Sequence, residues 1–198
     1  MIDYFKKLDF KLTDIDMSRI AGGPLYEGYG PSLKGYSILD IEYLNSIVSQ
    51  YIKFNIPPEL VSYTEIGDLG TYLPHTDYPM TTALNYYLDT VGGVTVFWKL
   101  KDTNTQPSFV DRLLEDGTWD HAKAQHVQRK DVVKVCEFKA GTHEPWLLNV
   151  GQYHTVVKTK PDVPRTMIRW LWSGVTFQQV LDSIEILEGG PDGKAAVC

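Results

Sequence analysis

The chain of 198 residues is long enough for one domain with a substantial core, and 43% of its residues are hydrophobic. Its net charge is −6, which disfavours a protein that binds nucleic acid through the phosphate backbone. Only two cysteines occur, Cys136 and Cys198, so neither a disulfide framework nor a paired-cysteine zinc site is expected.

Charged residues interrupt every apolar run at the amino terminus, which reads MIDYFKKLDFKLTDIDM. We therefore expect no signal peptide, and no apolar run of the chain approaches the length that spans a membrane. These features predict a soluble, cytoplasmic protein without membrane or nucleic-acid partners. They do not indicate an oligomeric state.

Residues 37–52 predict one amphipathic helix, because apolar side chains recur close to the helical period. Ser37 is expected to be its N-cap, and Asn55 followed by Pro57 ends the run. The apolar positions are Ile38, Ile41, Leu44, Val48 and Ile52.

Beyond residue 58 the chain consists of short segments rich in β-branched and aromatic residues, separated by Gly, Pro, Asn or Asp. Few helix-length segments lie between them, so an antiparallel sandwich or barrel is favoured over a parallel sheet. The expected strands are 60–66, 71–77, 80–89, 93–100, 132–138, 145–150, 154–159 and 165–172.

A polar insertion at 101–130 interrupts this pattern, and one short helix is expected around Val110–Leu114. A C-terminal helix is predicted by apolar residues on one helical face, at Phe177, Val180, Leu181, Ile184 and Leu187. We therefore expect a single domain, 1–198. It would comprise helical and strand support at 1–58, a barrel at 59–175 and a loose tail at 189–198.

The sequence PHTDYP places His75 and Asp77 two residues apart, and such residues project from the same face of a strand. His154 begins another strand-like segment. Two imidazoles and one carboxylate on one face of an octahedral ion form the facial triad of non-haem Fe(II) oxygenases, with open positions for other ligands. The alternative is a loop histidine bonded to a neighbouring carboxylate. The other histidines, His121, His126 and His143, are expected to be solvated side chains.

Arg165 opens the last expected strand after a short polar turn. If this strand lies beside that of His154, the guanidinium can point into the same cavity, where its planar fork suits the distal carboxylate of a dicarboxylic cosubstrate. The alternative is an ordinary surface arginine in an ion pair.

Several motifs occur in one order: Tyr63, Gly67, Gly70, Tyr72, His75, Asp77, Tyr86-Tyr87-Leu88, Gly92, Gly93, Thr95 and Phe97. Together with PWLLNVGQYHTVVKTKPDVPRTMIRWLW, they cover about seventy residues. This pattern resembles the catalytic core of the 2-oxoglutarate/Fe(II) dioxygenases, most closely their prolyl 4-hydroxylase-like branch.

The resemblance implies a mainly β, double-stranded β-helix (a jelly-roll or cupin-like barrel) with flanking N-terminal and C-terminal helices. It implies that His75, Asp77 and His154 bind Fe(II), and that Arg165 and Tyr87 bind the C5 carboxylate of 2-oxoglutarate. Tyr63 would face the iron side of the pocket. With O₂ as the other cosubstrate, the implied reaction hydroxylates an unactivated C–H bond of a prolyl residue or a small amino acid, in a peptide or small-molecule substrate.

Two departures from the family pattern are visible. The interval from His154 to Arg165 is longer than usual in this branch, which requires a longer turn. Met167 stands where many relatives have Ser or Thr, which removes one hydroxyl that could help to bind the carboxylate.

Strand alternation predicts which side chains of the last strand enter the cavity. Arg165, Met167, Arg169 and Leu171 would face inward, and Thr166, Ile168, Trp170 and Trp172 outward. Arg169 would then be a second inward cation, or it ends in solvent or pairs with a carboxylate such as Glu65. Asn85 would lie beside Tyr87, where its amide contacts cosubstrate or substrate, or makes a buried structural hydrogen bond.

Two other classes of function remain open. One is a non-catalytic jelly-roll protein in which the triad holds a structural metal ion or none. The other is a hydrolytic or isomerising metal enzyme of the cupin type, which usually has more histidine ligands.

Overall fold

The computed structural model describes residues 3–28, 33–67, 73–90, 92–109, 112–113, 119–120, 125–157 and 163–187. Within these ranges the fold is mainly β, and each strand pairing is antiparallel. The prediction of a mainly β fold with antiparallel strands is therefore confirmed. No helix of the described part is both long and apolar enough to cross a membrane.

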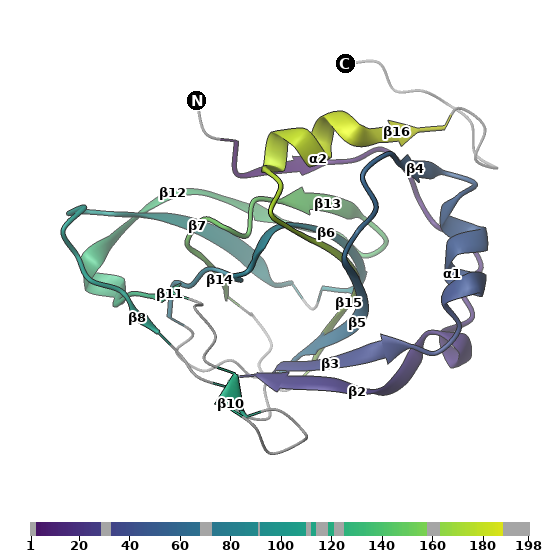
Figure 1. The fold of residues 1–198 in the computed structure, drawn as a ribbon, viewed down its shortest axis with the longest axis horizontal. Helices are drawn as coiled ribbons and strands as arrows, with labels where there is room; N and C mark the ends of the chain where they lie inside the picture. Colours follow the sequence, from purple (N-terminus) through teal and green to yellow (C-terminus); the bar gives the residue numbers. More distant parts are fainter. Residues whose placement is uncertain are drawn as a thin grey trace.

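The larger sheet has seven strands (Figure 1). In spatial order they are β1 (Phe5–Lys7), β13 (Pro145–Leu148), β6 (Met80–Asp89), β15 (Arg165–Ser173), β5 (Leu60–Ile66), β3 (Leu33–Ile38) and β2 (Ala21–Gly28). β15 therefore lies near the centre, paired on one side with β6 and on the other with β5.

A smaller sheet faces this one, with the order β12 (Val132–Lys139), β7 (Val94–Leu100) and β14 (His154–Val157). His75 extends it as an isolated bridge between His154 of β14 and His126 of β11 (Gln125–His126). Beyond β11 lies β8 (Ser108–Phe109). The remaining short pairs are β9 (Arg112–Leu113) with β10 (Trp119–Asp120), and β4 (Ile52–Phe54) with β16 (Ile184–Ile186).

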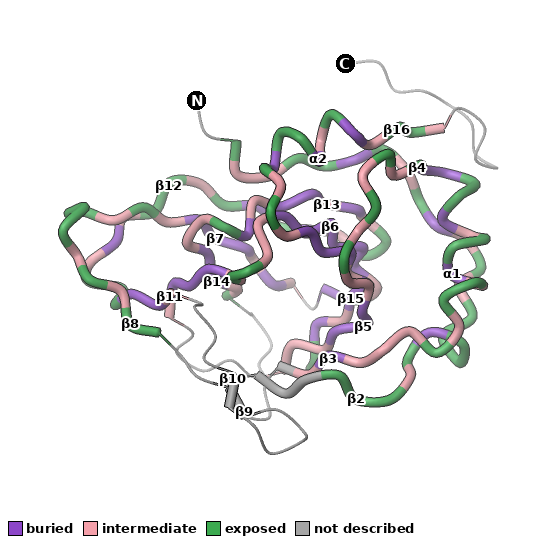
Figure 2. Tube along the Cα trace, viewed as in Figure 1, coloured by how far each residue is buried: buried purple, intermediate pink, exposed green. Residues whose placement is uncertain are grey.

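The larger sheet has a core on each of its faces, because alternate side chains along its strands point in opposite directions. The outer core packs the sheet against α1 (Ile41–Val48) and α2 (Phe177–Ser183), and it includes Leu44, Trp170 and Trp172. The inner core lies between the two sheets and includes Met167 and Phe97. Figure 2 shows the buried residues concentrated on the strands of the two sheets, whereas α1 has exposed residues on its outer side.

The two sheets lie as in a β-sandwich, and the described strands do not close into a barrel. The expected flanking helices are present as α1 and α2. The alternation predicted for β15 is confirmed, since Met167 and Leu171 belong to the inner core, whereas Ile168, Trp170 and Trp172 belong to the outer core.

The first helix is shorter than predicted, and its N-cap is Asp40 rather than Ser37. The Asp40 carboxylate accepts a hydrogen bond of 2.9 Å from the Tyr43 backbone N–H. Ser37 and Ile38 instead belong to β3, in which Ile38 pairs with Ala21 of β2. Ile52 likewise belongs to β4, so long-range strand pairing shortens the helix at both ends.

The C-terminal helix is also shorter than predicted. A capping box between Thr176 and Gln179 starts α2. The helix ends at Ser183, because Ile184 and Ile186 find antiparallel partners in β4. The expected helical position of Leu187 is therefore wrong, and the tail 189–198 lies outside the described residues.

Two further sequence predictions differ from the structure. In the predicted strand 71–77, only His75 forms a β-bridge, while Leu73, Pro74, Thr76 and Asp77 lie outside any strand and residues 71–72 lie outside the described ranges. The predicted helix around Val110–Leu114 is wrong where the structure describes it, because Arg112 and Leu113 form β9.

Candidate functional site

A pocket lies between the two sheets, over the central strands β6 and β15. Its apolar lining is Ile66, Leu148, Val150, Val156 and Met167. The empty space within the pocket and its mouth is about 520 Å³. Its polar groups fall into two sets, one around Asp77 and the other around Arg165. This composition, a largely apolar wall with a few convergent polar groups, is typical of a small-ligand site.

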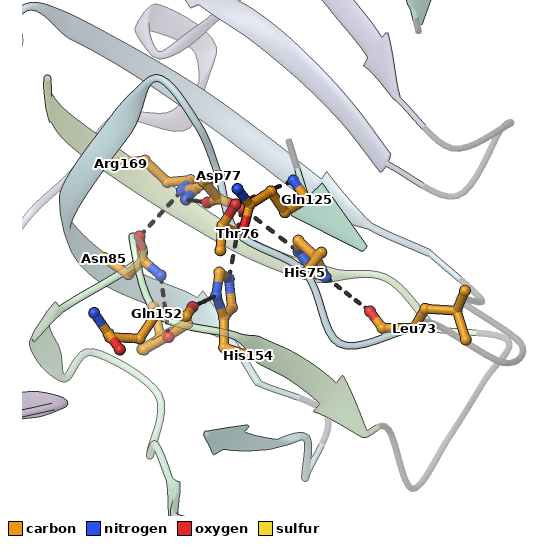
Figure 3. Close-up of polar contacts among 10 residues, drawn as sticks. Leu73, His75, Thr76, Asp77, Asn85, Gln125, Gln152, His154 and Arg169 are labelled. Carbon is orange, nitrogen blue, oxygen red and sulfur yellow. Dashed lines mark hydrogen bonds and ion pairs between the residues drawn. The ribbon is translucent and has the colours of Figure 1, made fainter. Parts of the chain in front are cut away.

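His75, Asp77 and His154 converge at one side of this pocket (Figure 3). The Oδ1 atom of Asp77 lies 3.5 Å from Nε2 of His75 and 3.6 Å from Nε2 of His154. The three potential ligand atoms all lie within 4.8 Å of one another, so they can bind one metal ion. The residues that the sequence predicted as a triad are therefore brought together.

Each histidine is held in the tautomer that metal binding requires. Nδ1 of His75 lies 3.0 Å from the carbonyl oxygen of Leu73, and Nδ1 of His154 lies 3.0 Å from that of Gln152. A carbonyl oxygen can only accept, so each Nδ1 donates its N–H, and in the neutral form of each ring the lone pair is on Nε2. Both lone pairs belong to the nitrogens that face Asp77.

Backbone pairing positions the three side chains. His75 and His154 exchange two backbone hydrogen bonds, of 3.1 and 2.9 Å, and the Asp77 N–H donates to Val150 O at 3.0 Å. Asp77 thus lies in a loop rather than on one strand with His75. The convergence arises because the loop is tied to the segment that precedes β14, which is a tertiary contact.

The electrostatics of the cluster favour the protonation states that a metal ion needs. Burial by itself raises the pKa of the Asp77 carboxyl, but His154, His75 and Arg169 together hold that pKa well below 3.8. Burial lowers the pKa of His154 to about 4, although Asp77 opposes this shift. At neutral pH the site therefore offers an ionised carboxylate and a neutral His154 imidazole.

Arg165 forms the other polar part of the pocket and is completely buried. Its guanidinium carbon lies 4.2 Å from the centre of the Tyr87 ring, and two of its nitrogens lie 3.4 Å from the Thr95 hydroxyl. Its Nε has no hydrogen-bond partner. No carboxylate within the described ranges pairs with it.

This environment is unusual for a charged group. Burial lowers the pKa of Arg165 from 12.5, and Tyr87 opposes the shift, but an arginine remains charged under these conditions. A buried cation without a counter-ion is costly, so the arrangement fits a site where a ligand supplies the negative charge. The surface ion pair considered as an alternative for Arg165 is wrong.

Arg169 also enters the pocket, as strand alternation predicted, but it has a carboxylate partner. Its Nη2 lies 2.8 Å from Oδ2 of Asp77, and its Nε donates to Oδ1 of Asn85 at 3.1 Å. The alternative pairing with Glu65 is wrong. Glu65 instead accepts hydrogen bonds of 3.2 Å from Tyr36 and Tyr63.

The two predicted tyrosines lie on different faces of the larger sheet. Tyr87 lines the pocket beside Arg165, and its hydroxyl accepts a hydrogen bond of 3.2 Å from Asn85. Tyr63 packs in the outer core. The expectation that Tyr63 faces the iron side is therefore wrong, because Tyr63 lies opposite Ile168 in the register and the inward position is taken by Thr64, opposite Met167.

His126 was expected to be a solvated side chain, and this expectation is wrong. It is 4% exposed, and its ring stacks on that of His75 with centroids 5.5 Å apart. Burial lowers its pKa to about 4, and the nearby His75 adds to that effect. No pattern in the sequence predicts this contact, since His126 lies in the polar insertion. His143 is exposed as expected, and His121 lies outside the described residues.

Comparisons of the chain with protein-family models, curated proteins and solved structures find no match. The functional conclusions therefore rest on the chemistry of the site and on the resemblance in sequence motifs.

Proposed function

We propose that this protein is an Fe(II)- and 2-oxoglutarate-dependent oxygenase that hydroxylates an unactivated C–H bond. One observation carries the proposal. A His-Asp-His cluster lines the same pocket as a buried arginine, Arg165, for which the described residues supply no carboxylate partner. The proposal includes the double-stranded β-helix fold, with which two facing antiparallel sheets are compatible.

The donor set fits Fe(II). Two imidazole nitrogens and one carboxylate oxygen suit non-haem iron, and they leave coordination positions for other ligands. Structural zinc sites instead surround the ion with four protein ligands, frequently including cysteine. The cluster has three members among the described residues, and none is a cysteine.

The second half of the pocket fits the distal carboxylate of 2-oxoglutarate. The Arg165 guanidinium can donate two parallel hydrogen bonds to a carboxylate, and the hydroxyls of Tyr87 and Thr95 lie beside it. A bound carboxylate would also supply the missing counter-charge. Apolar residues between the two polar groups, such as Met167 and Leu148, would exclude water from the ligand.

Fe(II) with 2-oxoglutarate and O₂ supplies the oxidising power for an unactivated C–H bond, which no protein side chain provides. The chain's own residues hold the ion, orient the cosubstrate and keep the pocket dry. The resemblance in motifs suggests a prolyl residue or a small amino acid as the substrate.

The test is an anaerobic titration of the purified protein with Fe(II) and then 2-oxoglutarate. We expect the weak visible absorption band of an iron-chelated keto acid, and succinate should form when air is admitted. His154→Ala should abolish both signals because it removes a metal ligand. His143→Ala, in an exposed turn, should retain both.

Absence of the band together with absence of succinate would overturn the oxygenase. If metal binding nevertheless persists in that case, the non-catalytic metal-binding protein becomes the correct interpretation. Once the band is seen, succinate formation with proline-containing peptides and free amino acids will identify the class of substrate.

A further inference from the structure

The two oxygens of the Asp77 carboxylate face different partners. Oδ1 faces Nε2 of both histidines, at 3.5 and 3.6 Å, whereas Oδ2 lies 2.8 Å from Nη2 of Arg169. A carboxylate that is free at both oxygens can bind a divalent ion in a bidentate manner and so occupy an extra coordination position. The contact with Arg169 engages the oxygen that bidentate binding would need.

The same guanidinium fixes a second side chain. An arginine can only donate, so the Asn85 atom that faces its Nε at 3.1 Å must be the amide oxygen. The Asn85 NH₂ group is therefore turned the other way, where it donates to the Tyr87 hydroxyl oxygen at 3.2 Å. Because this contact uses a lone pair of the hydroxyl, the hydroxyl proton is left for another acceptor.

These contacts form one continuous line through the pocket. It runs from Asp77 to Arg169, Asn85 and Tyr87, and the Tyr87 ring lies 4.2 Å from the Arg165 guanidinium carbon. Asn85, Tyr87 and Arg169 come from the inward faces of two adjacent strands, since Arg169 is paired with Asn85 in the register. Figure 3 shows Arg169 between Asp77 and Asn85.

We propose that Arg169 is a positioning residue that serves both halves of the pocket. It holds Asp77 so that one carboxylate oxygen binds the metal ion, and it orients Asn85 so that Tyr87 directs its hydroxyl proton toward the anion beside Arg165. The second role rests on the proposed function. The first requires only that the cluster binds a divalent metal ion.

The first role is tested with Mn(II) alone, in the absence of 2-oxoglutarate and without any turnover. The number of water molecules on bound Mn(II) is measured from the broadening of its electron paramagnetic resonance lines in ¹⁷O-enriched water. Arg169→Met should hold one bound water fewer than the wild type, because Asp77 then becomes bidentate. Arg169→Lys keeps a cation for Oδ2 and should match the wild type. An equal water count in wild type and Arg169→Met overturns this role, as does a wild type that does not bind Mn(II).

The second role is tested with a double-mutant cycle for 2-oxoglutarate binding to the Mn(II) protein. In the wild type, Tyr87→Phe should weaken binding about fivefold, because one hydrogen bond is lost. Lysine presents no planar fork, so Arg169→Lys should leave Asn85 unoriented. In that background Tyr87→Phe should then change the affinity less than about twofold. An undiminished effect of Tyr87→Phe overturns the second role.

The variants also separate this inference from the proposed function. Arg169→Lys retains the ion pair and should fold even if Arg169→Met does not, so the cycle remains measurable. A changed water count in Arg169→Met without any succinate production by the wild type would support the first role while the oxygenase proposal fails. Arg129→Met, which replaces an exposed arginine beside Trp98, is the matched control for both measurements.

Discussion

The two arginines of β15 point into the same pocket but have opposite surroundings. Arg169 is paired with Asp77 at 2.8 Å and with Asn85, so its charge and hydrogen bonds are satisfied within the protein. Arg165 is completely buried, contacts the Tyr87 side chain and the Thr95 hydroxyl, and leaves Nε without a hydrogen-bond partner. The difference teaches that a satisfied buried cation positions other protein groups, whereas an unsatisfied one indicates a ligand.

The largest expected effect comes from removing the unsatisfied cation. Arg165→Met should weaken 2-oxoglutarate binding about a hundredfold, because two charge-assisted hydrogen bonds are lost, and it should leave metal affinity unchanged. The melting temperature without ligand should stay the same or rise, since a buried charge without a partner is replaced by an apolar side chain. Calorimetric titration and thermal unfolding measure both quantities.

A clear fall in melting temperature for Arg165→Met, together with equal loss of metal and 2-oxoglutarate affinity, would contradict this comparison. Arg165 would then be a structural residue, as Arg169 partly is. Arg129→Met again serves as the control, because Arg129 is exposed.

The histidines on the Asp77 side of the pocket should also make the stability of the protein depend on pH, which the arginine side should not do. Burial lowers the pKa values of His154 and His126 to about 4 in the folded protein, from 6.5. The unfolded chain therefore binds more protons between these values. The contribution of these two histidines to the free energy of unfolding is fully present above pH 6.5. It is lost as pH falls to 4, by about 1 to 3 kcal/mol for each histidine.

Urea unfolding of the metal-free protein across this pH range measures the sign and the size of the change in the free energy of unfolding. His126→Phe keeps a flat ring beside His75 but cannot titrate, so its free energy of unfolding should fall less steeply with acid. A wild-type stability that does not change over this range, or an identical slope in the variant, would show that burial does not hold these imidazoles neutral.

A smaller effect on 2-oxoglutarate binding is expected from a substitution that crowds Arg165. A Cβ atom on Gly93 would lie 3.2 Å from the backbone oxygen of Thr90 and 3.4 Å from Nη1 of Arg165. Gly93→Ala should therefore displace the guanidinium slightly and weaken 2-oxoglutarate binding about threefold. The control is Gly23→Ala, since a Cβ there meets nothing within 4 Å and should leave affinity unchanged. Equal affinities of the two variants would mean that the fit around Arg165 is loose.

The smallest effect on ligand binding is expected for Tyr63. Tyr63→Phe removes its hydrogen bond to Glu65 in the outer core and should lower the free energy of unfolding by about 1 kcal/mol without altering affinity for 2-oxoglutarate. Tyr87→Phe should do the reverse, mainly weakening ligand binding. If Tyr63→Phe weakened binding as much as Tyr87→Phe, the assignment of the two faces of the larger sheet would be wrong.

Much of the candidate site could be predicted because strand alternation is a local property. Given that residues 165–172 form a strand, the inward positions of Arg165, Met167 and Arg169 follow from a period of two residues. The same rule placed Asn85 beside Tyr87 on β6. It could not place Tyr63, because both faces of β5 mix apolar and polar residues, and neither is marked as the one that meets the pocket.

The sequence by itself determined the mainly β character, most of the strand positions, the three members of the His-Asp-His cluster and the inward face of β15. Only the tertiary structure decided that Asp77 is Arg169's partner, that His126 stacks on His75, and that β3, β4 and β16 shorten the two helices. The physical reason is the distance along the chain over which each interaction acts. Periodicity and capping act between residues close in the chain, whereas the partner of a buried charge and the end of a helix depend on distant segments that compete for the same hydrogen bonds.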